Sequence, residues 1–180
     1  MKKGIFICSF LFLCFLLCSF DKIETKIIEV ENQELIQSYF TETIDDTHEL
    51  EQYLGILEIP SISLERGFYS YSSEKNTVGK NIEIVSPNCL PDESCDFILA
   101  SHSGTSNISF FKHLDQLNEY DIASIYYQNK KYSYKLVNIE SVIKNGIIQI
   151  ASIDKPRLIL TTCNKNNDNL QDIYYFELIS

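Results

Sequence analysis

The sequence is poor in glycine, proline and basic residues. It has 6 Gly and 4 Pro among 180 residues, with 11 Tyr and 11 Phe, which excludes a collagen-like or low-complexity chain. Fifteen Lys and Arg against 25 Asp and Glu give a formal net charge of −10. That charge argues against nucleic-acid binding, which needs a basic patch to displace phosphate counterions. Internal repeats and Gly-rich phosphate-binding loops are also missing. With 44% hydrophobic residues, the chain can bury the core of one domain.

Residues 4–20 carry no charge, and Lys2 and Lys3 precede them. As a helix this run is about 25 Å long, marginal for a bilayer core of about 30 Å. It is therefore a signal peptide or an uncleaved signal anchor, and a buried core helix is the third alternative. No small-x-small cleavage site follows the run, and its three cysteines each follow a large aliphatic residue, unlike a lipoprotein-type site. We expect a single-pass anchor in the cell membrane, with the lysines cytoplasmic and the rest of the chain extracytoplasmic.

Residues 21–52 are acidic and contain neither Gly nor Pro. Apolar residues recur there with a loose helical period, at Ile23, Ile27, Val30, Leu35 and Ile36. We predict a partly helical stalk between the membrane and the domain. Its like charges are expected to keep it solvated and extended.

Residues 53–180 consist of short β-type runs separated by turn residues. One helical turn or two is expected in residues 107–118, and a hairpin around residues 129–131. About eight strands with little helix predict an all-β fold, a closed or nearly closed eight-stranded β-barrel that hides its sheet edges. The predicted strands are 54–59, 62–71, 82–85, 97–101, 122–127, 132–143, 157–162 and 173–179.

Two reactive side chains lie at the ends of apolar strands. His102 follows FILAS, and Cys163 follows RLILTT. Reactive groups are often placed where a rigid strand passes into a loop. A thiol needs a base, because the thiolate is the nucleophile, and the same imidazole can later protonate a leaving amine. From these positions alone, a buried structural cysteine is the alternative.

The strings around these residues resemble the sortase family. They are LASHSG around His102, LTTC around Cys163, the upstream YLGILEIPSISL and the downstream FFKHLDQLNEYD. The resemblance runs from Tyr53 to Ser180 and implies an eight-stranded barrel and the activity of an extracytoplasmic cysteine transpeptidase of mostly Gram-positive bacteria. Such an enzyme cleaves a sorting signal such as LPxTG and transfers the acyl group to an amine of a cell-wall precursor or a pilin lysine. It implies that Cys163 is the nucleophile and His102 the general acid/base, supported by Thr162 and Ser103.

One residue that is typical of the sortase family is missing from this sequence. Sortases place an Arg on the final strand to stabilise the oxyanion, and no Arg follows Cys163 here. Alignment of the last strand puts Gln171 at that position, where its amide is a neutral hydrogen-bond donor without a guanidinium's charge or fork. Three alternatives follow: Gln171 replaces the Arg, Lys165 or Arg157 supplies the charge, or the protein is slow or inactive.

Cys89 and Cys95 lie in one loop, residues 86–96. A disulfide, free thiols and a metal site are the alternatives, and we expect no metal or other cofactor because further ligands at matched spacing are missing. The loop precedes the strand that leads to His102, which suggests that it borders the substrate groove. His113 is interpreted as a surface histidine, and His48 and the acid pairs 45–46 and 92–93 as solvated.

The first functional hypothesis is thus a membrane-anchored cysteine transpeptidase whose partners are sorting-signal peptides and an acceptor amine. The missing Arg motivates a second, a sortase-like module that binds sorting signals without cleaving them. The third is an unrelated exported cysteine hydrolase, which would form its product with water even when amine is abundant.

Overall fold

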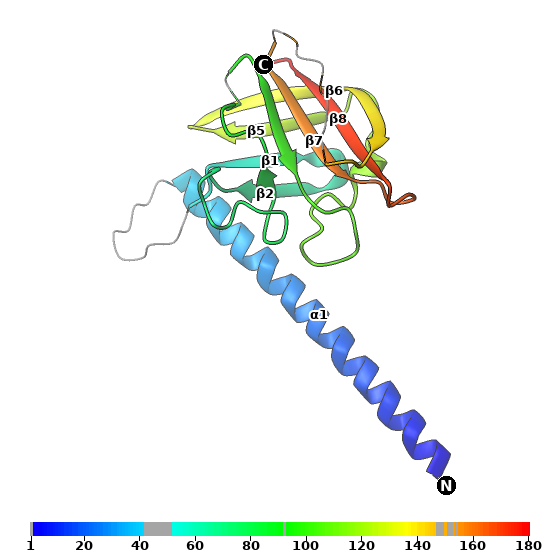
Figure 1. Ribbon diagram of the computed structural model, residues 1–180. Helices are drawn as coiled ribbons and strands as arrows, with labels where there is room; N and C mark the ends of the chain where they lie inside the picture. Colours follow the sequence, from blue (N-terminus) through cyan, green and yellow to red (C-terminus); the bar gives the residue numbers. More distant parts are fainter. Residues whose placement is uncertain (1, 42–51, 92, 147–149, 151–152, 154) are drawn as a thin grey trace.

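In the described part of the chain, the fold consists of one long helix, eight strands and two short 3-10 helices (Figure 1). The computed structural model describes residues 2–41, 52–91, 93–146, 150, 153 and 155–180, with side chains from residue 17 onward except that of Cys18. The elements in chain order are α1 (Lys2–Thr41), β1 (Gly55–Ile59), η1 (Pro60–Ile62), β2 (Leu64–Phe68), β3 (Glu83–Ile84), β4 (Asp96–Ala100), η2 (Leu114–Gln116), β5 (Ile122–Tyr127), β6 (Lys130–Ile143), β7 (Arg157–Cys163) and β8 (Leu170–Leu178).

The strands form one sheet in the order β2-β1-β5-β6-β8-β7-β4-β3. A bridge between Phe68, at the end of β2, and Ile82, just before β3, brings the two edges of the sheet together. The predicted all-β, nearly closed eight-stranded barrel is therefore confirmed. Of the ladders between named strands, β4–β7 is the parallel one, so the carboxyl ends of these two strands lie at the same end of the barrel.

The strand sequences decide which side chains face the interior. Alternation along β7 turns Leu158 and Leu160 into the main core, and Ile159 to the outer face, where it packs with Ile173 and Tyr175. β4 contributes Phe97 and Leu99 to the same main core. Because Thr161 and Cys163 follow Ile159 at a spacing of two, they also lie on the outer face of the barrel.

The acidic stalk packs on the domain, whereas the sequence analysis expected it to stay solvated and extended. α1 runs as one helix to Thr41, and Leu35 and Ile36, both 6% exposed, pack against Tyr53 on the barrel. The buried Asn32 donates to the Glu65 carbonyl (3.0 Å) and accepts from the Tyr53 hydroxyl (3.1 Å). The expectation was wrong because it was based on the net charge of the segment. One face of the helix carries apolar residues together with an Asn that forms hydrogen bonds with polar groups of the barrel.

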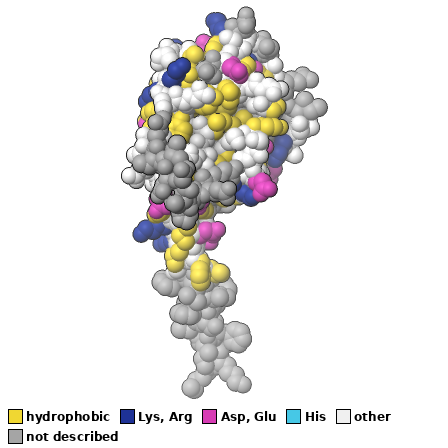
Figure 2. All heavy atoms as spheres, turned by 90° about the vertical axis from the view of Figure 1, so that its left-hand side faces the viewer, with side chains coloured by type: hydrophobic (Ala, Val, Ile, Leu, Met, Phe, Trp, Pro, Cys, Tyr) yellow, Lys and Arg dark blue, Asp and Glu magenta, His cyan; other side chains and the backbone are white. Residues whose placement is uncertain are grey.

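The other apolar residues of α1 remain exposed. Ile23, Ile27 and Val30 are 57%, 60% and 49% exposed, and Figure 2 shows hydrophobic side chains on the part of the helix that leaves the barrel. Among the residues that the structure describes, no helix is long and apolar enough to cross a membrane. Most side chains of the predicted membrane segment, residues 4–20, lie outside the described part of the chain, as do residues 42–51 of the predicted stalk.

Asn32→Ala is expected to loosen α1 from the barrel. The substitution removes the side-chain donor to the Glu65 carbonyl and one of the partners of the Tyr53 hydroxyl, and burial raises the pKa of that phenol, so it stays a protonated donor. An unpaired buried polar group costs about 1–3 kcal/mol. Urea unfolding should therefore show a loss of about 2 kcal/mol, whereas Gln37→Ala, at an exposed helical position, should change stability by less than about 0.5 kcal/mol. Equal effects of the two substitutions would contradict the role of Asn32.

Candidate active site

The parallel pair β4–β7 brings the two reactive strand ends together. The ladder ends at Ala100 opposite Thr161, so two residues further along each strand His102 follows β4 and Cys163 ends β7. The backbones stay joined beyond the ladder, because the Thr162 hydroxyl donates to the Ser101 carbonyl (2.7 Å). The Ser103 hydroxyl likewise donates to the Cys163 carbonyl (2.6 Å). Thr162 and Ser103 thus hold the backbone on either side of His102 against the end of β7.

His102 and Cys163 line one pocket of about 630 Å³. Both side chains are half-buried, and Cys163 is the free thiol among the cysteines whose side chains the structure describes. The sulfur therefore opens to the pocket and is not packed into the barrel core. The remaining lining residues come from the loops after β4 and β7: Ser103, Gly104, Thr105, Lys112, His113, Asn164, Lys165 and Asp168. A thiol and an imidazole in one accessible pocket can perform nucleophilic acyl transfer.

Lys144 is a residue that the sequence analysis missed. It follows the last residue of β6, and its Nζ lies 3.1 Å from Cys163 Sγ. Nineteen positions separate the two residues, and no local motif connects them. The signal that could have found Lys144 is indirect: a lysine at the end of a long strand, two strands away from the cysteine in the sheet order.

Gln171 lies directly opposite Cys163 in the β7–β8 ladder. Its amide Nε2 donates to the Thr161 hydroxyl at 2.6 Å, and Thr161 is buried. The amide is thus bound to the outer face of β7 and is not among the pocket lining. The register thus places Gln171 on the last strand beside Cys163, and its amide is hydrogen-bonded to Thr161.

The two cations considered as substitutes for the missing Arg have other partners. Arg157 forms two hydrogen bonds with the Asp96 carboxylate (2.6 and 2.8 Å) at the start of β7, the end remote from Cys163. Lys165 lines the pocket, but its Nζ lies 2.7 Å from an Asp115 carboxylate oxygen. Neither side chain is bonded to the thiol.

Cys89 and Cys95 form a disulfide within the loop that precedes β4. Their sulfurs and the Glu93 carboxylate lie within 4.8 Å of one another, but both sulfurs are used in the disulfide. The backbone N–H of Arg157 donates to the Cys95 carbonyl, which places this loop at the start of β4 and β7. The expected position of the loop beside the groove is therefore not found for the His102–Cys163 pocket, which lies beyond the opposite ends of these strands and is lined by none of the described residues of the loop.

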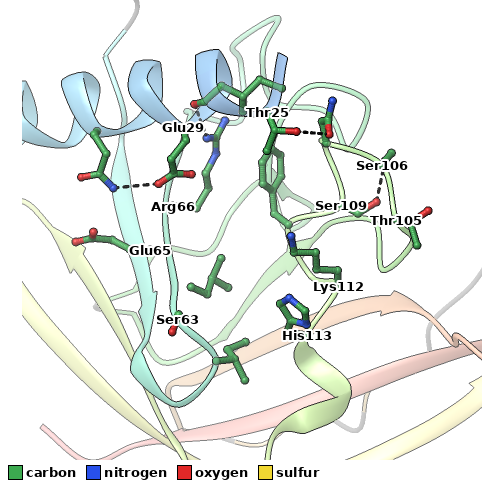
Figure 3. A pocket seen from close by; sticks show the side chains of 16 residues that line it. Thr25, Glu29, Ser63, Glu65, Arg66, Thr105, Ser106, Ser109, Lys112 and His113 are labelled. Carbon is green, nitrogen blue, oxygen red and sulfur yellow. Dashed lines mark hydrogen bonds between the residues drawn. The ribbon is translucent and has the colours of Figure 1, made fainter. Parts of the chain in front are cut away.

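His113 is exposed, and its Nδ1 lies 3.0 Å from the Gln116 amide nitrogen. It lines the His102–Cys163 pocket and also a second cavity of about 480 Å³ between α1, β2 and the loop after His102 (Figure 3). Its neighbour Lys112 lines both cavities as well. His48 and the 45–46 acid pair lie outside the described residues, as does Asp92 of the other pair.

Helix α1 contacts the loop that leads away from His102. The Thr25 hydroxyl donates to the Asn107 side-chain oxygen (2.6 Å), and Figure 3 shows Thr25 with this hydrogen bond. The Asn107 amide donates to Glu24 (3.3 Å), so this loop is hydrogen-bonded to α1. Arg66 lies between α1 and the barrel, with its guanidinium 4.2 Å from the centre of the Phe110 ring and one nitrogen donating to the Ile28 carbonyl. Burial lowers the pKa of Arg66 from its ordinary value. The helix therefore forms one wall beside the candidate active site.

A family model described as a sortase domain matches residues 57–175, and the chain belongs to the sortase family. It is 23% identical to sortase A of Bacillus anthracis over 150 residues, which cover 83% of this chain and 70% of that protein. The solved structure of Clostridium perfringens sortase D5, a transpeptidase, is 16% identical with a TM-score of 0.64, over 86% of this chain and 99% of that one. Sortase C1 of Streptococcus agalactiae is 24% identical with a TM-score of 0.62, over 82% and 76% of the two chains. These structural likenesses establish the fold.

Proposed function

We propose that this chain is a cysteine transpeptidase that cleaves the C-terminal sorting signal of surface proteins and transfers the acyl fragment to an amine. The observation that carries the proposal is that Cys163 and His102 line one open pocket at the ends of adjacent parallel strands. Membership of a family of cysteine transpeptidases supports it. The proposed substrate is a peptide with an LPxTG-like signal, and the proposed acceptor is an amine of a cell-wall precursor or a pilin lysine.

In the first half-reaction, the Cys163 thiolate attacks the carbonyl carbon of the Thr–Gly bond and forms a tetrahedral oxyanion. The C–N bond then breaks, His102 donates a proton to the leaving amine, and a thioester remains on Cys163. In the second half-reaction, the acceptor amine attacks the thioester and gives its proton to His102. The C–S bond breaks, so a new amide forms and the thiolate returns.

The proposal includes an extracytoplasmic location. Residues 4–20 are uncharged and follow Lys2 and Lys3, the pattern of a signal anchor with its amino terminus in the cytoplasm. Docking of α1 on the barrel through Asn32, Leu35 and Ile36 would then hold the candidate active site at a fixed distance from the membrane surface.

The proposal is tested on the full-length chain, expressed with its amino terminus intact and separated into membrane and soluble fractions. Each fraction is incubated with a labelled LPxTG-type peptide and a primary amine. We expect an amide product in the membrane fraction and a covalent adduct on Cys163, detected by mass spectrometry and released by hydroxylamine. Peptide that remains intact with several acceptor amines and no adduct would reject the proposed activity, and activity confined to the soluble fraction would reject the anchor.

The second candidate function is a module that binds sorting signals without cleaving them. Two observations favour it: no Arg follows Cys163, and the Gln171 amide is bonded to Thr161. Thiol alkylation separates the candidates. A Cys163 thiol that reacts readily and depends on His102 supports the transpeptidase, whereas peptide binding combined with an inert thiol supports the module.

A further inference from the structure

The charged group that forms a hydrogen bond with the Cys163 sulfur is the ammonium of a lysine. Lys144 Nζ lies 3.1 Å from Sγ, within hydrogen-bonding distance of a sulfur acceptor. The backbone of Lys144 is fixed as well, because its N–H donates to the Asn169 carbonyl at 2.8 Å. This bond continues the β6–β8 pairing by one residue beyond Ile143 and Leu170. The side chain therefore extends from an ordered strand end.

The sheet register explains why Lys144 reaches the thiol. Val142 pairs with Gln171 across β6 and β8, and Gln171 pairs with Cys163 across β8 and β7. Paired residues project from the same face of a sheet, and so do residues two apart on one strand. Lys144 thus shares the outer face with Cys163 and Gln171, one pair closer to the end of the barrel than Val142. A lysine is long enough to pass β8 from there.

Four other basic side chains on the barrel and its loops have different positions or partners. Lys165 lies 2.7 Å from Asp115, and Arg157 holds Asp96 at the far end of β7. Arg66 donates to the side-chain oxygen of Asn81 and stacks on Phe110. Lys112 lines the pocket on the side of the His102 loop. The direct contact with the sulfur belongs to Lys144.

We propose that Lys144 is a catalytic residue that supplies, from the end of β6, the positive charge that an Arg on the last strand supplies in other sortases. The inference rests on the proposed transpeptidase function. The Lys144 ammonium pairs with the Cys163 thiolate before attack and with the oxyanion afterwards. The oxyanion oxygen is within reach of the same ammonium because only the attacked carbon lies between this oxygen and the sulfur. Lys144 keeps its proton throughout, because His102 carries the protons between the leaving and the attacking amine. Gln171 then holds Thr161 and the end of β7 in place.

The size of the effect follows from the distance. Two unit charges 3.1 Å apart attract one another, even in a water-like dielectric, by an amount that corresponds to about a tenfold change in rate. Loss of a donor to the oxyanion lowers acyl-transfer rates by about 10²–10³-fold. Removing Lys144 therefore affects both the free thiol and the transition state, and it affects the transition state more.

The test compares substitutions of Lys144 in the full-length chain, purified in mild detergent. For Lys144→Ala and Lys144→Gln we expect kcat/KM for the peptide and amine to fall about 10²-fold and alkylation of Cys163 by the neutral reagent iodoacetamide at pH 7 to slow about tenfold. Lys144→Arg is expected to restore most of both rates, because it keeps the charge. The matched control is Lys130→Ala, an exposed lysine at the opposite end of β6, which should leave both rates within about twofold.

The result that overturns the inference is a Lys144→Ala protein with both rates within twofold of the wild type. A Lys144→Gln protein as fast as Lys144→Arg overturns it too, since charge would then be irrelevant. So does a larger loss in Gln171→Ala than in Lys144→Ala, which would assign the oxyanion to Gln171. If the wild type forms no Cys163-dependent product, the proposed function fails, and the alkylation rates alone still decide whether Lys144 activates the thiol.

Discussion

Replacement of Cys163 by Ala is expected to reduce product formation by about 10⁴–10⁶-fold, to the uncatalysed background. The sulfur is the only protein atom in the proposed mechanism that becomes covalently bonded to the acyl group, so its loss removes both half-reactions together. The measurement is the rate of amide formation from a labelled sorting peptide and an amine, together with the mass of the protein after incubation.

Peptide affinity is expected to stay within several-fold of the wild type in the same variant, because the other lining residues of the 630 Å³ pocket are unchanged. Thermal unfolding should change by less than about 0.5 kcal/mol, since the Cys163 thiol lies at a half-buried site and not in the core. Persistence of the product after Cys163→Ala would reject the assignment of the nucleophile. If the product contains water in place of the amine even when amine is abundant, the protein is a hydrolase and not a transpeptidase.

The second large effect concerns the ion pair at the other end of β4 and β7. Asp96→Ala is expected to destabilise the domain by about 3–5 kcal/mol, because it leaves Arg157, with 9% of its side chain exposed, buried without its carboxylate. That loss is a large fraction of the 5–15 kcal/mol typical of a domain. Urea unfolding monitored by circular dichroism measures it.

A matched surface pair provides the control for Asp96. Lys131 and Glu58 lie 3.3 Å apart with 49% and 29% of their side chains exposed, and Glu58→Ala should cost less than about 1 kcal/mol. The double variant Asp96→Ala/Arg157→Met should recover much of the stability, because it removes the unpaired charge. If Asp96→Ala and Glu58→Ala cost the same, burial of the pair does not determine its contribution.

The two ends of the parallel strand pair β4–β7 thus have different roles. At the start of β4 and β7, Arg157 and Asp96 bind the strands together, and the Cys95 carbonyl accepts the Arg157 N–H. At the other end, the strands pass into loops, and the pocket opens between His102 and Cys163. This separation lets one end fix the register while the other presents its side chains to a substrate.

Local sequence patterns were sufficient for most of the barrel. The run Ile122–Tyr127 coincides with β5, and the other predicted strands overlap those observed, because apolar alternation bounded by turn residues is a property of neighbouring residues. The hairpin turn was placed at residues 129–131, but the chain turns at Gln128 and Asn129, both with positive φ (49° and 59°). Since β-turn geometry depends on backbone conformation as well as composition, β6 begins at Lys130, two residues before the predicted strand start at residue 132.

The sequence by itself determined the strand-forming segments, the placement of His102 and Cys163 at strand ends, and the lack of an Arg after the cysteine. The tertiary structure decided that Lys144 lies against the thiol, that the Gln171 amide bonds to Thr161, and that α1 packs on the barrel. It also placed the Cys89–Cys95 loop away from the pocket. The physical reason is that a strand pattern is local, whereas each of these contacts joins segments that become neighbours only when the sheet adopts its order β6-β8-β7-β4 or when α1 docks on the barrel.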